Sequence, residues 1–178
     1  MIKSIKDTIV YHGSYTKIEN IDLKYAKKTK DFGKGFYVTT DRKQAIKFAR
    51  LIAKRNRLTY GYLNSYLLSD LSNLDIVEFL STNSKWLNCI VGFRDNDFMS
   101  FTKGYTSRDV IIGKIADDDT SLVINAYITG AYGKVGSKEA YDTAVKLLKP
   151  EKLKNQICFK TNKAISKLHY IDSEVVKI

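Results

Sequence analysis

The sequence predicts a single α+β domain that spans residues 1–178. Its length suits one domain, and an apolar share of 44% is enough to form a packed core. Segments with strand and helix patterns follow one another without the strict alternation that is typical of a parallel, doubly wound sheet. No internal repeat, low-complexity tract or linker divides the chain, so we expect one core.

The chain opens with a strand and a polar loop. The run TIVYH over residues 8–12 is rich in β-branched and aromatic residues and stops at Gly13. This pattern predicts a strand that ends in a turn. Residues 15–31 are polar and show little periodicity, which indicates a loop.

A second strand and a helix follow. Residues 36–39 come directly after two glycines and are apolar and aromatic, so they are expected to form a strand. Asp41 is a suitable N-cap for a helix that continues to about residue 56. Two further strands are predicted at 60–68 and 76–79.

The second half is expected to contain three helices and the remaining strands. Residues 84–93 have helical spacing, with Trp86 in the core rather than on a binding surface. Residues 122–128 are almost wholly apolar and predict a buried helix after the acidic turn at 117–119. Ser137 caps a helix that ends at Leu148, and Pro150 lies beyond its end. Strands are predicted at 110–115, 157–159, 168–171 and 175–178.

Positive charge is concentrated in the first third of the chain. The formal net charge is +11, but residues 1–60 hold 15 Lys+Arg against 5 Asp+Glu, whereas the other 118 residues hold 15 against 14. Helical spacing predicts one basic face, opposite an apolar stripe directed at a core. Such a face suits phosphates or an acidic partner, or it is simply a solvated helix face. The basic residues are Lys43, Lys47, Arg50, Lys54 and Arg57, and the apolar residues are Ala45, Phe48, Ala49 and Ile52.

Several classes of protein are excluded or disfavoured. No run of 18 apolar residues is present, so we expect no membrane span. The first ten residues lack an apolar signal core, and the two cysteines, Cys89 and Cys158, have no metal-type spacing. A reduced, cytoplasmic protein without a metal site is therefore expected, with Cys158 a core thiol and His169 a surface residue.

Three segments carry polar groups that a packed core does not require. His12, Gly13 and Ser14 stand at the end of the first strand, and Gln156 stands at the head of a late strand. Between them, the segment DFGKGFYV at 31–38 places two glycines around a lysine before an aromatic pair. It matches neither the phosphate-binding loop GxxxxGK[ST] nor the dinucleotide fingerprint GxGxxG.

Together these segments resemble the ADP-ribosyltransferase superfamily, on the diphtheria-toxin and poly-ADP-ribose-polymerase branch with a His-Tyr-acid triad. The resemblance rests on three segments, which follow the family's order along the chain: YHGS at 11–14, DFGKGFYVTTDRKQAIKFA at 31–49 and NQICFK at 155–160. Gln156 stands where the family usually has glutamate. The chain also resembles short bacterial members that occur in toxin–antitoxin or phage-defence gene pairs.

The resemblance implies a fold and an activity. The fold is a split β-sandwich of two small antiparallel sheets with flanking helices, here with a helical insertion at about 84–150. The activity is mono-ADP-ribosyl transfer from NAD to a nucleic acid or a protein, as an intracellular bacterial toxin. An acidic antitoxin protein is an implied partner.

The resemblance also implies site residues. The catalytic set is His12, Tyr37 and Gln156. His12 would bind the adenosine ribose, the backbone of Gly13 would bind the nicotinamide amide, and Tyr37 would stack on the nicotinamide ring. Ser14, Gly33, Gly35, Lys43, Gln44 and Phe48 complete the expected NAD-binding set, with Phe48 at a second stacking position and the two glycines turning the loop beneath NAD.

Gln156 is the departure that leaves an alternative open. Glutamine accepts the same hydrogen bond from a ribose hydroxyl as glutamate does, but it brings no negative charge to the forming cation. The alternative is a catalytically silent module of the same fold that binds NAD, ADP-ribose or nucleic acid. An unrelated basic α+β protein that binds nucleic acid is a third reading.

Overall fold

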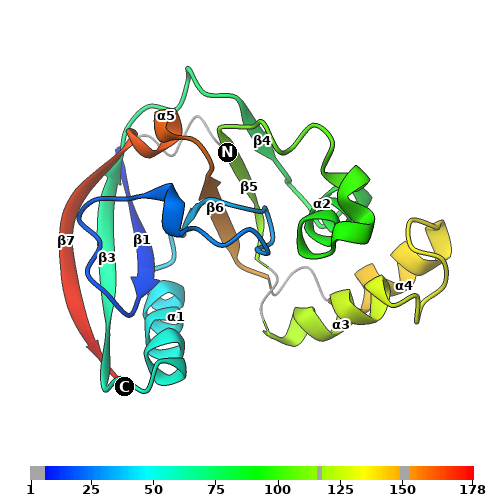
Figure 1. The fold of residues 1–178 in the computed structure, drawn as a ribbon, viewed down its shortest axis with the longest axis horizontal. Helices are drawn as coiled ribbons and strands as arrows, with labels where there is room; N and C mark the ends of the chain where they lie inside the picture. Colours follow the sequence, from blue (N-terminus) through cyan, green and yellow to red (C-terminus); the bar gives the residue numbers. More distant parts are fainter. Residues whose placement is uncertain (1–6, 116–117, 149–152) are drawn as a thin grey trace.

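The computed structural model describes residues 7–115, 118–148 and 153–178, and it has the expected α+β class. Two sheets and a group of helices form successive layers (Figure 1). Sheet A lies on one side of sheet B, and helices α2, α3 and α4 lie on the other side. Sheet B therefore has a partner layer on each face.

Sheet A contains three antiparallel strands in the order β1-β3-β7. They are β1 (Thr8–Ser14), β3 (Tyr60–Leu68) and β7 (Leu168–Lys177). The sequence predicts two short strands at the C-terminal end, and this prediction is wrong, because β7 is continuous. Its polar middle is tolerated because β7 is an edge strand that pairs with β3 along its length, and Ser173 lies within hydrogen-bond distance of Asn64 there.

Sheet B contains four strands in the order β2-β6-β5-β4. They are β2 (Phe36–Val38), β6 (Asn155–Phe159), β5 (Val110–Lys114) and β4 (Ile76–Glu78). The pairs β2–β6 and β5–β6 are antiparallel, but β4 and β5 are parallel. The expectation of two purely antiparallel sheets is therefore wrong. The reason is the long connection through α2 (Ser84–Arg94), which brings the chain back in the same direction, as a parallel pair requires.

One apolar core fills the space between the sheets. Both sheets contribute side chains to it: Val10, Tyr66 and Leu68 come from sheet A, and Ile112 and Phe159 come from sheet B. We call this cluster the sandwich core. A short 3-10 turn, η2 (Leu23–Tyr25), and helix α5 (Asn162–Ile165) lie in the connections around it.

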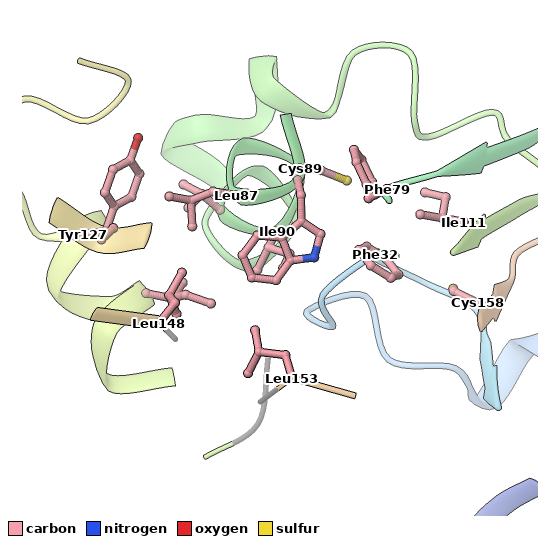
Figure 2. Packing of buried hydrophobic residues seen from close by; sticks show 14 of the residues in the cluster. Phe32, Phe79, Leu87, Cys89, Ile90, Ile111, Tyr127, Leu148, Leu153 and Cys158 are labelled. Carbon is pink, nitrogen blue, oxygen red and sulfur yellow. The ribbon is translucent and has the colours of Figure 1, made fainter. Parts of the chain in front are cut away.

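A second core lies between the other face of sheet B and the helices (Figure 2). We call it the helical core; it includes Trp86, Ile111 and Cys158. Its helices are α2, the 3-10 segment η3 (Asn96–Thr102), α3 (Asp118–Ile128) and α4 (Lys138–Leu148). The range 84–150, expected to be a helical insertion, also contains β5, so its helices form two groups around a central strand of sheet B. Asp117 and Pro150 lie outside the described residues.

Helix α1 (Arg42–Arg55) packs against β1 and β3. It begins where the sequence predicts, because the Asp41 side chain accepts the N–H of Gln44 at 3.1 Å. The buried stripe consists of Ala45, Ala49 and Ala53, whereas Phe48 is 37% exposed and does not face the core as expected. These small residues let β1 approach closely. A Cβ on Gly13 would lie 2.2 Å from the Ala45 carbonyl oxygen, so the contact requires glycine.

Candidate functional site

The first two sequence motifs meet where β1 passes β2. Tyr11 and Thr39 exchange two backbone hydrogen bonds, of 2.8 and 3.0 Å, in an isolated antiparallel bridge. Continuing that register by two residues sets Gly13 opposite Tyr37. Because backbone groups alternate in direction along a strand, the N–H and C=O of Gly13 point away from β3, as those of Tyr11 do. Among the described residues, none hydrogen-bonds either group of Gly13.

His12 connects the two motifs through its ring. Nδ1 lies 2.7 Å from the carbonyl oxygen of Tyr37, and the ring stacks on Phe36 with 4.4 Å between centroids. Burial lowers the pKa of His12; the Tyr37 carbonyl acts in the opposite direction, and the positive charge of Lys30 lowers it further. The imidazole is therefore neutral at neutral pH. Since a carbonyl only accepts, Nδ1 carries the hydrogen and Nε2 is left as an acceptor.

The side chain of Tyr37 anchors the loop at 31–35. Its hydroxyl donates to the carbonyl oxygen of Gly33 at 2.7 Å and accepts the N–H of Phe32 at 3.0 Å. Lys160 Nζ donates to the carbonyl oxygen of Phe32 at 2.6 Å, and Gly33 has a φ of +76°, which favours glycine. Burial raises the pKa of the Tyr37 phenol well above its usual value. Hydrogen bonds from Tyr37 and Lys160 thus hold the loop.

Gln156 lies on the same face of sheet B as Tyr37. Cys158 pairs with Tyr37 across the β2–β6 ladder, and Gln156 is two positions away on β6, so alternation directs all three side chains to one face. Gln156 is 6% exposed. Its Nε2 donates to Asp31 Oδ2 at 2.8 Å and lies 3.4 Å from the carbonyl oxygen of Lys114. The site thus includes a buried amide beside a carboxylate.

The remaining expected residues divide into two groups. Ser14 is buried, and its Oγ accepts the N–H of Thr16 at 3.2 Å. Gln44 faces the head of β6, because Thr39 Oγ1 lies 3.2 Å from Gln44 Oε1 and 3.1 Å from the carbonyl oxygen of Asn155. These two residues border the junction of β1, β2 and β6.

Lys43, Phe48 and Gly35 lie in other surroundings. A Cβ on Gly35 would meet Cys158 Sγ at 2.4 Å, so this glycine is required by internal packing. Phe48 is half-exposed on α1. Lys43 lines a groove of about 560 Å³ on the outer side of α1. We call this feature the α1 groove; its lining is Lys43, Ile46, Lys47, Arg50, Leu51 and Lys54. Arg57 does not belong to it, because α1 ends at Arg55.

Sequence reasoning missed three charged residues of the site. Asp31 bonds to Gln156, Arg94 from α2 pairs with Asp31 at 2.6 Å, and Lys160 from the end of β6 holds the loop. Asp31 stands inside a recognised motif, so its position was a usable signal. Arg94 is 63 positions away from Asp31 and carries no motif, so only folding reveals it.

Neither cysteine is suited to nucleophilic chemistry. Cys89 and Cys158 are both free and buried. Burial raises the pKa of Cys158 to about 12, and burial also raises that of Cys89, so both are thiols at neutral pH. The expectation of a core thiol at Cys158 is confirmed, and His169 is exposed on β7, as expected.

Two features are absent from the residues that the structure describes. In residues 7–115, 118–148 and 153–178, no helix is both long and apolar enough to cross a membrane. Within the same ranges, no group of three or more His, Cys, Asp or Glu could hold a metal ion.

Comparison with known proteins identifies one family. A family described as "Protein of unknown function (DUF3990)" matches residues 8–170, which is most of the chain. Neither a curated protein nor a solved structure matches the chain.

Proposed function

The chain belongs to the DUF3990 family, and we propose that it is a mono-ADP-ribosyltransferase that uses NAD as its substrate. The observation that carries the proposal is the meeting of the three motif segments at one junction. His12 bonds to the carbonyl of Tyr37, and Gln156 shares a sheet face with Tyr37. These are the segments that resemble ADP-ribosyltransferases, and they are remote from one another along the chain.

The proposed reaction exchanges one bond at the anomeric carbon of the nicotinamide ribose. The bond from that carbon to the nicotinamide nitrogen breaks, and its electron pair leaves with neutral nicotinamide. A nucleophile of the acceptor then bonds to the carbon and releases a proton. The transition state resembles an oxocarbenium ion, so the protein's contribution is to orient the sugar and stabilise positive charge.

The geometry supports a role for each central residue. His12 Nε2 is an acceptor suited to a ribose hydroxyl, because the other ring nitrogen is committed to Tyr37. The outward N–H and C=O of Gly13 form a donor and acceptor pair that complements the carboxamide of nicotinamide. Position 37 is opposite Gly13 when the Tyr11–Thr39 register is continued by two residues, and an aromatic side chain at this position suits stacking on a nicotinamide ring bound nearby.

The charge distribution supports the proposed partners. Four cations line the α1 groove, and no acidic residue belongs to α1. The N-terminal end of α1 lies beside the head of β6, since Gln44 and Asn155 share contacts with Thr39. An acceptor nucleic acid bound along the groove would therefore reach the site; a protein acceptor or an acidic antitoxin would use the same charge. We place the protein in the bacterial cytoplasm, as an intracellular toxin.

The test is transfer of label from NAD. The purified chain is incubated with NAD labelled in the adenosine part, together with total bacterial RNA, DNA or lysate protein, and both label transfer and nicotinamide release are measured. We expect transfer to one fraction, and loss of NAD binding, transfer and toxicity in Tyr37→Ala. Tyr25→Ala is the matched control, because Tyr25 is 87% exposed, and it is expected to keep wild-type activity. Full activity of Tyr37→Ala would contradict the proposed role of Tyr37. A wild-type chain that neither binds NAD nor transfers label, with nucleic-acid binding unchanged in Tyr37→Ala, would contradict the proposal and favour an unrelated nucleic-acid binder.

A second candidate is a silent binding module of the same fold. The observation that favours it is the neutral amide at Gln156, where a carboxylate would stabilise the cation directly. This candidate predicts that NAD or ADP-ribose raises the melting temperature while no fraction receives label and no nicotinamide is released. Calorimetric melting with and without NAD tests for binding, and label transfer together with nicotinamide release separates the two candidates.

A further inference from the structure

The amide of Gln156 is hydrogen-bonded to a largely buried ion pair. Arg94 donates to Asp31 Oδ1 from Nε at 3.1 Å and from Nη2 at 2.6 Å. The side chains of Arg94 and Asp31 are only 17% and 10% exposed. Asp31 Oδ2 instead accepts the N–H of Gln156 at 2.8 Å. The two carboxylate oxygens of Asp31 therefore have different partners: Oδ1 accepts from the guanidinium of Arg94, and Oδ2 accepts from the amide of Gln156.

These contacts determine the orientation of the amide. Asp31 Oδ2 and the Lys114 carbonyl oxygen are both acceptors, so both must face the –NH₂ group of Gln156. The carbonyl oxygen Oε1 is then directed away from them. No donor for Oε1 is found among the described residues. A carbonyl oxygen only accepts hydrogen bonds, so Oε1 in this orientation is suited to receive a hydroxyl from a ligand.

We propose that Asp31 is a positioning residue that restores, through the hydrogen bond to Gln156, the negative charge that glutamine lacks. This inference rests on the proposed function. A carboxylate that accepts from an amide N–H polarises the amide and makes its oxygen a stronger acceptor, and such coupling is strongest away from water. The pair of Asp31 and Gln156 thereby takes the place of the usual single glutamate.

The surrounding contacts keep the pair in place. Trp86 Nε1 donates to the same Lys114 carbonyl oxygen at 3.1 Å, which holds that acceptor against the amide. Arg94 Nη1 also lies 3.4 Å from Ser121 Oγ on α3. The orientation of Gln156 is thus set by the 31–35 loop, β5 and α2 together. Such support from several elements is what a precisely oriented group needs.

An exchange of the two side chains tests the inference. Asp31→Asn removes the charge, Gln156→Glu places a second carboxylate beside the first, and the double variant D31N/Q156E restores one carboxylate and one amide in contact. The four proteins, including wild type, form a double-mutant cycle. Nicotinamide release gives kcat and KM, and urea unfolding without NAD gives stability. Asp75→Asn is the matched control, because Asp75 also pairs with an arginine, Arg108, but at β4.

We expect Asp31→Asn to lower kcat by at least about tenfold, with KM changed less than about threefold, because a charge-stabilising contact acts mainly in the transition state. The double variant is expected to recover most of that loss, and Asp75→Asn to keep wild-type kcat. Gln156→Glu alone is expected to acquire a new ionisation in its pH profile, because two adjacent carboxylates cannot both ionise freely. This ionisation disappears in the double variant.

Each outcome has a distinct meaning. Wild-type kcat in Asp31→Asn, or a pH profile of Gln156→Glu without a new ionisation, overturns the inference and leaves the proposed function intact. If Asp31→Asn does not fold, the pH profile of Gln156→Glu decides whether the inference holds. A wild-type chain that releases no nicotinamide contradicts the proposed function itself. In that event the unfolding cycle still decides whether Asp31 and Gln156 are coupled, and additive stabilities would overturn the pairing.

Discussion

At the scale of single residues, the site is built from groups held in one protonation state. His12 is neutral because burial opposes its charged form, and Tyr37 is a phenol for the same reason. Each uses one polar atom to join two segments: the ring of His12 joins β1 to β2, and the hydroxyl of Tyr37 joins β2 to the 31–35 loop. The structural roles and the proposed chemical roles therefore belong to the same side chains.

The lowered pKa of His12 predicts how stability depends on pH. An unfolded histidine titrates near pH 6.5. Since the folded chain binds this proton less readily than the unfolded chain, stability is complete above about pH 6.5 and is lost as the pH falls through that value toward the lower folded pKa. We expect the urea midpoint of wild type to drop between about pH 7.5 and 5.5.

His12→Gln provides the comparison, because it keeps an N–H donor for the Tyr37 carbonyl but does not titrate. Its urea midpoint is expected to change less over the same pH range, while His169 is present in both proteins. An equal drop in the two proteins would contradict a titration of His12.

At the scale of elements, α1 has one face that packs against the sheet and one face that is open to solvent. The alanine face allows contact with Gly13 and β1, and the outer face carries the α1 groove. Phe48 lies between these faces rather than in the core. The helix thus joins the proposed NAD site to a basic surface.

The α1 groove predicts a salt-dependent interaction with RNA. We expect Lys47→Gln and Lys54→Gln to weaken RNA binding and to reduce the slope of log K against log salt by about 0.7 for each lost phosphate contact. Both residues are on the solvent side of α1, so the free energy of unfolding is expected to change by less than about 0.5 kcal/mol. Binding is measured at several salt concentrations.

Lys138→Gln on α4 is the control, because its side chain is 85% exposed and it lies on a different helix. It is expected to leave the salt slope unchanged. Equal effects of the α1 and α4 substitutions would contradict a role for the groove.

At the scale of the whole molecule, sheet B joins the two cores. Its strands contribute to the sandwich core on one face and to the helical core on the other, and the 31–35 loop, with the side chains of Tyr37 and Gln156, lies on the helical side. Loss of sheet B would therefore expose both cores at once. The site depends on the same sheet, so its integrity follows that of the fold.

This arrangement predicts one cooperative unfolding transition. Trp86 is the only tryptophan and is fully buried in the helical core, so its fluorescence reports that core alone. Circular dichroism reports the backbone of the whole chain. We expect the two signals to give the same urea midpoint, as two-state unfolding requires. Separate midpoints would show that the helical core unfolds independently of sheet A.

Much of the fold could be predicted from local patterns. The cap at Asp41, the helical spacing around Trp86 and the cap at Ser137 each lie within one element, and each prediction is confirmed. The parallel pairing of β4 with β5 and the continuity of β7 could not be predicted in this way. Both depend on which strand lies alongside, and that choice is made by contacts far apart in the sequence.

The sequence by itself determined the α+β class, the position of most elements, the concentration of charge in the first third and the three motif segments. Only the tertiary structure decided that His12, Tyr37 and Gln156 belong to one junction, that Phe48 is half-exposed, and that Asp31 and Arg94 stand behind Gln156. The physical reason is the distance along the chain over which each kind of interaction acts. Caps and periodicity act over a few residues, whereas the orientation of a buried amide depends on acceptors contributed by other elements.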